Sequence, residues 1–322
     1  MRLPFFRRTG RGGMLGIDCG GPDELSLVHI SQNGQNGLKL LSSGRISLNG
    51  NDPKTDLADF VQKHAGPKVP AVGVMPLQSY SLMQVEAPDV PEEEMRQAVQ
   101  WKVKDLIDYS LDEAVIDAFP TPQSPGRGKM VYVVSAHMDA VRTHIDLLQG
   151  VRIKLKAIDI PELALRNVAA LTPEARKGIC LVYLGQKTGL IVIVKEHILY
   201  VARNLKHGSV DLNRAASEKS NYDLLDTESP YQVLLESMVL DVQRTLDYYE
   251  STFGMASIGK VMVTADDAPP SGLMKHLQNN LGTEVTSLNV SDLFVGPRGN
   301  NAAQGFTILA LGAALSQGGR DL

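Results

Sequence analysis

Apolar and polar positions change along this chain in short blocks, and turns that contain glycine or proline separate the blocks. Alternating or short continuous apolar runs are typical of strands. In the first half of the chain they predict strands at 14–18, 25–31, 38–41, 45–48, 69–75, 80–85, 114–119, 130–136 and 154–158. In the second half they predict strands at 179–184, 189–194, 198–201, 260–264 and 284–288.

Longer segments with a 3.6-residue apolar period lie between these strands and predict helices. The longest, 231–253, places apolar side chains at 234, 235, 238, 239, 242, 246 and 249. Shorter helices are predicted at 52–65, 91–107, 139–148, 161–171, 271–281 and 305–315, with helix and loop together over 206–229. Strands that alternate with helices in this way favour an α/β fold, here with two lobes.

One short pattern occurs twice, about half the chain apart. A strand meets a glycine turn at 16–20 and again at 181–185, and another strand follows each turn. This echo favours a duplicated domain, in which the backbone N–H groups of two glycine turns cradle phosphates. The alternative stays open at this point, because a strand, a glycine and a second strand follow one another in many α/β folds.

Composition excludes several classes of protein. The net charge of −4 disfavours a basic nucleic-acid binder, so we expect no nucleic-acid partner. Hydrophobic residues at 43% and charged residues at 21% are near the averages of globular chains and disfavour disorder. Two cysteines cannot build a disulfide framework. No apolar run reaches the length of a membrane helix, and we expect a cytoplasmic protein.

Residues 1–13 carry four arginines and no acidic residue. We interpret this segment as a flexible basic arm that leads into the first strand. Each arginine near an anionic membrane surface would contribute about 1 kcal/mol of binding. A peripheral membrane contact therefore remains an alternative to a solvated arm.

Motifs for catalysis or metal binding are absent from the sequence. The seven histidines show no metal-ligand spacing, and there is no Walker A motif or Gly-x-Ser-x-Gly elbow. The acidic run 92–94 begins a predicted helix, where the helix dipole favours negative charge. Cys19 is interpreted as a small buried side chain, with a reactive thiol as the alternative. We therefore expect no catalytic residue and no metal-ligating residue.

One stretch of the chain is unusually specific, Val-Pro-Glu-Glu-Glu-Met at 90–95, continued by Ala-Val-Gln-Trp-Lys at 98–102. Further stretches lie at 15–20, 81–85, 110–117, 133–136, 157–162 and 241–249. Together, and in this order, they resemble the PilM family of actin-like type IV pilus assembly proteins. The chain looks most like the MshI branch of this family, which serves the mannose-sensitive haemagglutinin (MSHA) pilus.

The resemblance implies a two-lobed, actin-like and ribonuclease-H-like α/β fold with an FtsA-like subdomain inserted in the first lobe. The first lobe would span 14–178, with the insertion at about 80–156, and the second lobe would span 179–322. It also implies a cytoplasmic scaffold at the inner face of the inner membrane. Its expected partners are the cytoplasmic tail of a PilN-like single-pass membrane protein and other proteins of the assembly platform.

The resemblance also implies a nucleotide site, and it maps this site onto Asp18, Gly20, Gly21 and Gly185. Asp18 is the first-lobe acid that such a fold uses to hold hydrated Mg²⁺, and the three glycines lie in the phosphate turns. The corresponding acid of the second lobe is replaced by Tyr183.

The turns themselves also depart from the family pattern. Pro22 has no N–H to donate, and Asp23 and Glu24 would repel a phosphate. The glycine-rich adenosine stretch of the family becomes Ala-Asp-Asp-Ala-Pro at 265–269. We therefore expect a degenerate site that disfavours ATP and Mg²⁺ and does not hydrolyse ATP. The alternative is an ATP-binding conformational switch of the same assembly platform.

Overall fold

The computed structural model describes residues 13–21, 23–32, 37–49, 52–126, 128–222, 229–266, 269–295 and 305–316. They form two units. Unit 1 takes the chain up to Ala164 and again from Ser291, and unit 2 is Leu165–Val290. Most of the basic arm, together with Pro22, Asp267 and Ala268, lies outside the described residues.

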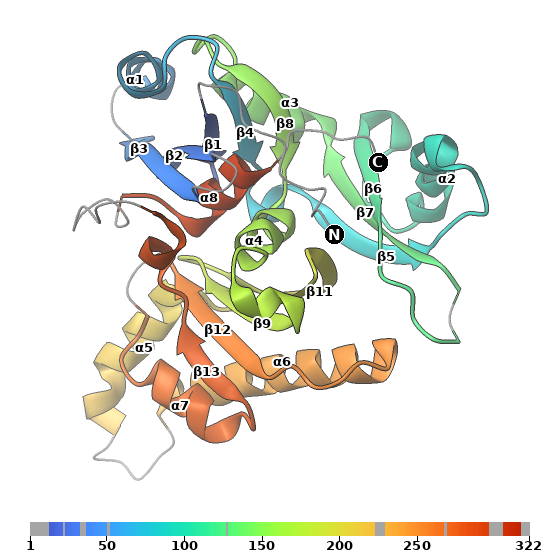
Figure 1. The fold of residues 1–322 in the computed structure, drawn as a ribbon, viewed down its shortest axis with the longest axis vertical. Helices are drawn as coiled ribbons and strands as arrows, with labels where there is room; N and C mark the ends of the chain where they lie inside the picture. The colour runs from blue at the N-terminus through green and yellow to red at the C-terminus, as the bar shows by residue number, and fades with distance from the viewer. Residues whose placement is uncertain are drawn as a thin grey trace. The chain divides into compact units, whose positions relative to one another are not determined.

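Unit 1 contains a five-stranded mixed sheet with the order β3-β2-β1-β4-β8 (Figure 1). β1 pairs antiparallel with β2 and parallel with β4. The bounds are β1 Met14–Asp18, β2 Glu24–Gln32, β3 Leu38–Ser47, β4 Pro70–Val74 and β8 Lys154–Asp159. β1 is buried along its whole length, as its short apolar run predicts. The two strands predicted at 38–41 and 45–48 form one continuous strand, β3.

A second, three-stranded antiparallel sheet in unit 1 has the order β5-β7-β6. Its elements are β5 Ser81–Glu86, α2 Glu92–Val103, β6 Ala114–Pro120 and β7 Met130–His137. Val99 and Val103 of α2 share an apolar core with Val85, Ile116 and Val133 of the strands. This sheet is the inserted subdomain, and it is shorter than the expected 80–156, because β8 pairs with β4 in the main sheet.

The remaining helices that belong to unit 1 or begin in it are α1 Pro53–Phe60, α3 Met138–Leu148, α4 Pro161–Ala169 and α8 Ile308–Leu315. α1 lies within the helix predicted at 52–65, and Asp52 caps its start by accepting a hydrogen bond from the Lys54 N–H. The helical turn that follows, η2 Val61–Ala65, is a π-helix. Short 3₁₀ turns elsewhere are η3 Leu77–Ser79, η4 Leu111–Glu113, η5 Pro173–Arg176 and η6 Val290–Leu293.

α8 corrects the predicted lobe boundary, which placed residues 179–322 together. The helix packs on β1, β2 and β4 of unit 1 (Figure 1). Gly16 permits this contact, because a Cβ at that position would lie 1.9 Å from the Ala310 carbonyl oxygen. The other side of α8 contacts α4, where a Cβ on Gly312 would lie 2.2 Å from the Ala164 carbonyl oxygen. The sequence predicted a helix at 305–315, but no pattern in it indicated which sheet the helix packs on.

Unit 2 contains a sheet with the order β11-β10-β9-β12-β13. The bounds are β9 Ile179–Leu184, β10 Gly189–Lys195, β11 Ile198–Leu205, β12 Lys260–Ala265 and β13 Glu284–Ser287. Its first three strands are antiparallel and the last two are parallel additions, as in unit 1. The echo between 16–20 and 181–185 therefore marks the equivalent central strands β1 and β9 of two sheets with one topology.

The helices of unit 2 are α5 Ser209–Tyr222, α6 Pro230–Phe253 and α7 Leu273–Asn280. Ser229 caps α6 by accepting a hydrogen bond from the Gln232 N–H, and Pro230 occupies the first helical position. Gly254 ends the helix in the left-handed conformation, with φ of 60°. Among the described residues, none of the helices of either unit is both long enough and apolar enough to span a bilayer.

Candidate functional site

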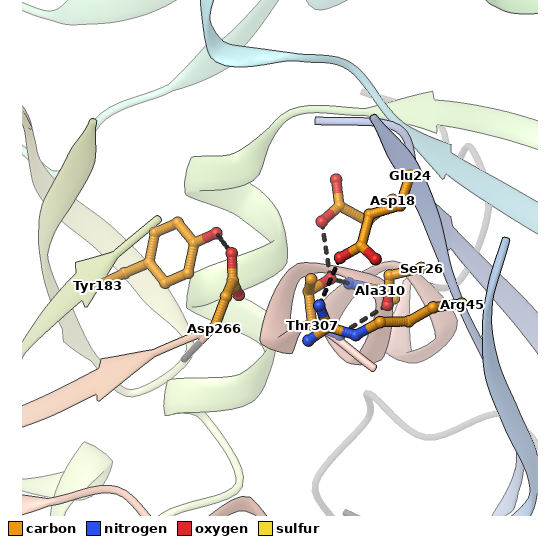
Figure 2. Close-up of polar contacts among 8 residues, drawn as sticks. All are labelled: Asp18, Glu24, Ser26, Arg45, Tyr183, Asp266, Thr307 and Ala310. Atoms are coloured by element: carbon orange, nitrogen blue, oxygen red, sulfur yellow. Dashed lines mark hydrogen bonds and ion pairs between the residues drawn. The ribbon is translucent and has the colours of Figure 1, made fainter. Parts of the chain in front are cut away.

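Asp18 lies at the carboxyl end of β1, and its side chain is buried at 3% exposure. One carboxylate oxygen accepts the Gly20 N–H at 2.8 Å. The other accepts the Thr307 hydroxyl at 2.6 Å (Figure 2). Asp18, Gly20 and Gly21 are therefore brought together at one turn, as predicted, but the carboxylate is already bound by groups of its own unit.

Thr307 connects this turn to α8. Its hydroxyl donates to Asp18 and accepts the Ala310 N–H at 3.2 Å, so it is also the N-cap of α8. Its own N–H donates to the Ser26 hydroxyl oxygen at 2.6 Å. Sequence reasoning missed this role, because Thr307 lies 289 positions from Asp18. A threonine before an apolar run signals a helix cap. No local pattern in the sequence indicates that the hydroxyl of this cap also binds Asp18.

The protonation of Asp18 is set mainly by its burial. Desolvation raises the pKa of the Asp18 carboxyl above its ordinary value, and the hydrogen bonds from Thr307 and Gly20 lower it in part. The turn next to Asp18 also differs from the sequence expectation. Glu24 forms an ion pair with Arg45 (Figure 2), so its charge is partly compensated and repels an anion less than we predicted. Asp23 is exposed.

In unit 2 the corresponding strand end carries Tyr183. Its hydroxyl donates to a carboxylate oxygen of Asp266 at 2.6 Å (Figure 2), and the Asp266 N–H donates to the Leu184 carbonyl. A Cβ on Gly185 would lie 3.2 Å from the Tyr183 hydroxyl. The tyrosine therefore covers the glycine turn of its own unit and is held there by the aspartate that follows β12.

The glycine turn after β9 is also used to cap α5. The Gly185 carbonyl accepts the Ser209 N–H at 2.8 Å, and the Gln186 carbonyl accepts the Val210 N–H at 3.0 Å. The approach requires a glycine at 208, where a Cβ would lie 2.5 Å from the Gly185 oxygen. Two first-turn N–H groups of α5, of the kind that commonly bind phosphates, are thus occupied by protein carbonyls.

A family model described as type IV pilus assembly protein PilM matches residues 68–304. The chain belongs to the PilM family. The sequence resemblance to this family is therefore confirmed. A comparison with curated protein sequences finds no match.

Solved structures agree with the family on the fold. A PilM-PilN type IV pilus biogenesis complex contains a chain that is 20% identical, with a TM-score of 0.72 over 95% of this chain and 98% of that one. A Bacteroides thetaiotaomicron protein with an actin-like ATPase fold and unknown function is 8% identical, with a TM-score of 0.50 over 98% and 100%. The predicted two-lobed actin-like fold with an inserted subdomain is confirmed.

Two other kinds of chemistry were considered for this PilM-family chain, metal binding and a reactive Cys19 thiol. The described residues contain no cluster of histidine, cysteine, aspartate or glutamate that could hold a metal ion. Cys19 is buried, and desolvation raises the pKa of its thiol far above the ordinary value. The thiolate needed for reactivity is therefore disfavoured, which supports the interpretation of Cys19 as a small core side chain.

Proposed function

We propose that this PilM-family chain is a non-enzymatic scaffold whose nucleotide site is degenerate. The observation that carries this proposal is the closed hydrogen bonding of Asp18, whose two carboxylate oxygens are taken by Gly20 and Thr307. To bind hydrated Mg²⁺, Asp18 would have to carry its charge in a buried position and share oxygens that already accept hydrogen bonds. Its raised pKa disfavours that charged form.

Unit 2 supports the same proposal independently. At the position where an actin-like site would need a second carboxylate, this chain has Tyr183. The Tyr183 hydroxyl donates a hydrogen bond to Asp266. A phenol does not ionise near neutral pH and is a poor Mg²⁺ ligand. Either feature alone, the hydrogen-bonded Asp18 of unit 1 or the Tyr183 of unit 2, would weaken nucleotide binding. The two features together weaken it further.

We further propose that the partner is the cytoplasmic tail of a PilN-like single-pass membrane protein, which would place the chain in the cytoplasm at the inner membrane. The support is the PilM-PilN complex, whose fold this chain shares over almost its full length. β5 is a suitable strand for the tail to pair with, because among the described residues it pairs only with β7. Its other edge can accept an extended peptide as an added strand. The pilus served would be of the MSHA type, as the resemblance to MshI implies.

Two assays on the purified chain test these proposals separately. With Mg-ATP we expect no thermal shift and no phosphate release, whereas a ligand at 100 times its Kd would stabilise the fold by about 2.7 kcal/mol. A clear shift that Asp18→Ala abolishes would overturn the degenerate site and favour the ATP-dependent switch.

The partner proposal is tested by titrating a synthetic tail peptide of the PilN-like protein, with a scrambled peptide as control. We expect saturable binding at micromolar concentrations, with amide shifts centred on β5. Absence of binding at high micromolar peptide, or binding that leaves β5 unaffected, would overturn this part of the proposal. Neither result depends on the outcome with ATP.

A further inference from the structure

Tyr80 lies where the chain leaves the main sheet of unit 1 and enters the three-stranded sheet of the inserted subdomain. β4 ends at Val74, the short turn η3 follows, and Tyr80 is the residue directly before β5. Its backbone is already extended, with φ of −151° and ψ of 167°. A contact that fixes Tyr80 therefore also fixes the position at which β5 starts.

The contact that fixes Tyr80 is a hydrogen bond to a helix that is distant in the sequence. The Tyr80 hydroxyl donates to a carboxyl oxygen of Glu162 at 2.5 Å, across 82 positions of the chain. Glu162 lies in the first turn of α4, and its side chain is 2% exposed. This hydrogen bond joins the entry of the inserted subdomain to the body of unit 1.

The start of α4 is a fixed anchor for this bond. The Ile160 carbonyl accepts the N–H groups of Leu163 and Ala164 at 3.1 and 3.0 Å. Ala164 is fully buried, and its backbone touches α8, because a Cβ on Gly312 would lie 2.2 Å from the Ala164 carbonyl oxygen. Close backbone contacts of this kind do not adjust to a neighbour. When the start of β5 moves, Glu162 cannot follow, and the bond to Tyr80 breaks.

The acceptor in this bond is a group that can lose a proton. Burial raises the pKa of Glu162 to about 7, the charge of Asp159 raises it further, and the Tyr80 hydrogen bond lowers it in part. Tyr80 and Asp159 are the side chains of other elements that act on this pKa, and neither carries a positive charge. On α4 itself, the Arg166 guanidinium donates to the side chain of Asn167.

We infer that the Tyr80–Glu162 hydrogen bond is a latch that positions β5 and that loosens when Glu162 loses its proton. With the proton bound, the pair is neutral and remains buried at little cost. Without it, a negative charge is left in a buried position beside Asp159, and opening the latch lets water reach that charge. The latch does not depend on nucleotide or on the tail peptide. Only its consequence for peptide binding at the free edge of β5 rests on the proposed function.

Native-state hydrogen exchange of the full chain, without peptide, tests the latch at about pH 5.5 and about pH 7.5. Rates are corrected for the pH dependence of intrinsic amide exchange. Protection at the start of β5 should then be roughly 20-fold lower at the higher pH, as proton linkage requires for a carboxyl whose pKa falls from about 7 to its ordinary value on opening. The start of β5 should also be less protected than β1 at both pH values, because opening the latch leaves the main sheet folded.

Two variants separate the latch from a general change in stability. Glu162→Gln keeps an acceptor in place and has no proton to lose in this range, so the pH difference at β5 should disappear. Tyr80→Phe removes the hydroxyl, so the start of β5 should be weakly protected to the same extent at both pH values, although Glu162 still titrates. Tyr109→Phe is the matched control. The Tyr109 hydroxyl bonds the Ser135 hydroxyl at 2.8 Å within the same subdomain, and this variant should keep the pH difference of the wild type.

Four results would overturn the inference. Equal protection of β5 and β1 would show global unfolding in place of a local opening, and a wild type without a pH difference at β5 would show that no proton controls it. A pH difference that survives in Glu162→Gln would belong to another group, such as the His137 imidazole at the end of β7. A pH difference that survives in Tyr80→Phe would show that Glu162 does not act through Tyr80. Circular dichroism establishes that each variant is folded, and the nearly isosteric Glu162→Gln decides the test by itself should Tyr80→Phe not fold.

Discussion

At the scale of residues, the main feature is a buried carboxylate that is satisfied entirely by its own unit. The Thr307 hydroxyl carries two hydrogen bonds at once, donating to Asp18 and accepting the Ala310 N–H. A buried carboxylate that loses one such donor keeps its desolvation cost without compensation. Thr307 therefore contributes more to stability than an average cap residue, because it joins a helix start to a strand end.

Thr307→Val should reveal this role, since valine keeps the shape of threonine and removes the hydroxyl. We expect a loss of about 2–4 kcal/mol in the free energy of unfolding, from the lost hydrogen bond to the buried Asp18 carboxyl and the lost helix cap together. Urea unfolding measures it, and Thr307→Ser, which keeps the hydroxyl, should lose less than half as much. Equal losses in both variants would show that the methyl group rather than the hydroxyl bond matters.

A second buried carboxyl, Glu162, gives unit 1 a pH dependence. Burial raises the pKa of Glu162 to about 7, although the hydrogen bond from the Tyr80 hydroxyl, at 2.5 Å, lowers it in part. Between the unfolded value of 4.5 and about 7, the folded state binds more protons than the unfolded state. The free energy of unfolding should therefore fall as the pH rises through this window, by up to about 3 kcal/mol.

Glu162→Gln removes this titration and should flatten that part of the profile. His144 acts in the opposite direction, because burial lowers its pKa to about 4 and so costs stability as the pH falls. The difference between Glu162→Gln and the wild type isolates the glutamate from the histidine. We expect this difference to grow in favour of the variant from pH 4.5 to 7 and to be constant above; a difference independent of pH would contradict the assignment.

At the scale of elements, α8 holds the core of unit 1 together through close backbone contacts. Half of its residues are alanine or glycine. Two glycines, Gly16 of β1 and Gly312 of α8, let the backbones of β1, α8 and α4 approach one another. Such contacts cannot be relaxed by turning a side chain, because the neighbouring atoms belong to the backbone.

Gly16→Ala should therefore be strongly destabilising, since its Cβ would lie 1.9 Å from the Ala310 oxygen and 2.5 Å from the Ala314 nitrogen. We expect a loss of about 3 kcal/mol or more in the free energy of unfolding, as for severe overpacking. Gly259→Ala is the control, because nothing lies within 4 Å of its Cβ position. That change should be neutral or stabilising by less than about 1 kcal/mol. Similar effects at both positions would contradict the close approach of α8 to β1.

Much of this element level could be predicted from periodicity and turn residues. Short apolar runs predicted the central strands, and the 3.6-residue apolar period predicted a helix at 231–253, where α6 runs from Pro230 to Phe253. What could not be predicted are contacts between distant segments. Tyr183 was expected only as a missing acid, and its bond to Asp266 depends on the parallel pairing of β9 with β12. Likewise, no local pattern links Thr307 to Asp18.

At the scale of the whole molecule, the two units share one sheet topology, but only one of them is formed by a single continuous segment of the chain. Unit 2 is a single segment, Leu165–Val290, whereas unit 1 needs the C-terminal segment from Ser291 onward to complete its core. All but the last residue of α8 is buried. The two sequence halves that the echo at 16–20 and 181–185 suggests are therefore not the two folding units, because the end of the chain returns to the first sheet.

Truncation before Ser291 should therefore damage unit 1 and spare unit 2. Loss of Ile308, Leu309 and Leu311 alone removes on the order of 5 kcal/mol of apolar burial, which is comparable to the whole stability of a typical domain. Native-state hydrogen exchange on the truncated chain should show lost protection at β1 and β2, with protection retained at β9, β10 and α6. Adding the missing segment as a peptide should restore protection in β1. If β9 lost protection as readily as β1, the two units would form one cooperative structure, and the assignment of the C-terminal segment to unit 1 alone would be wrong.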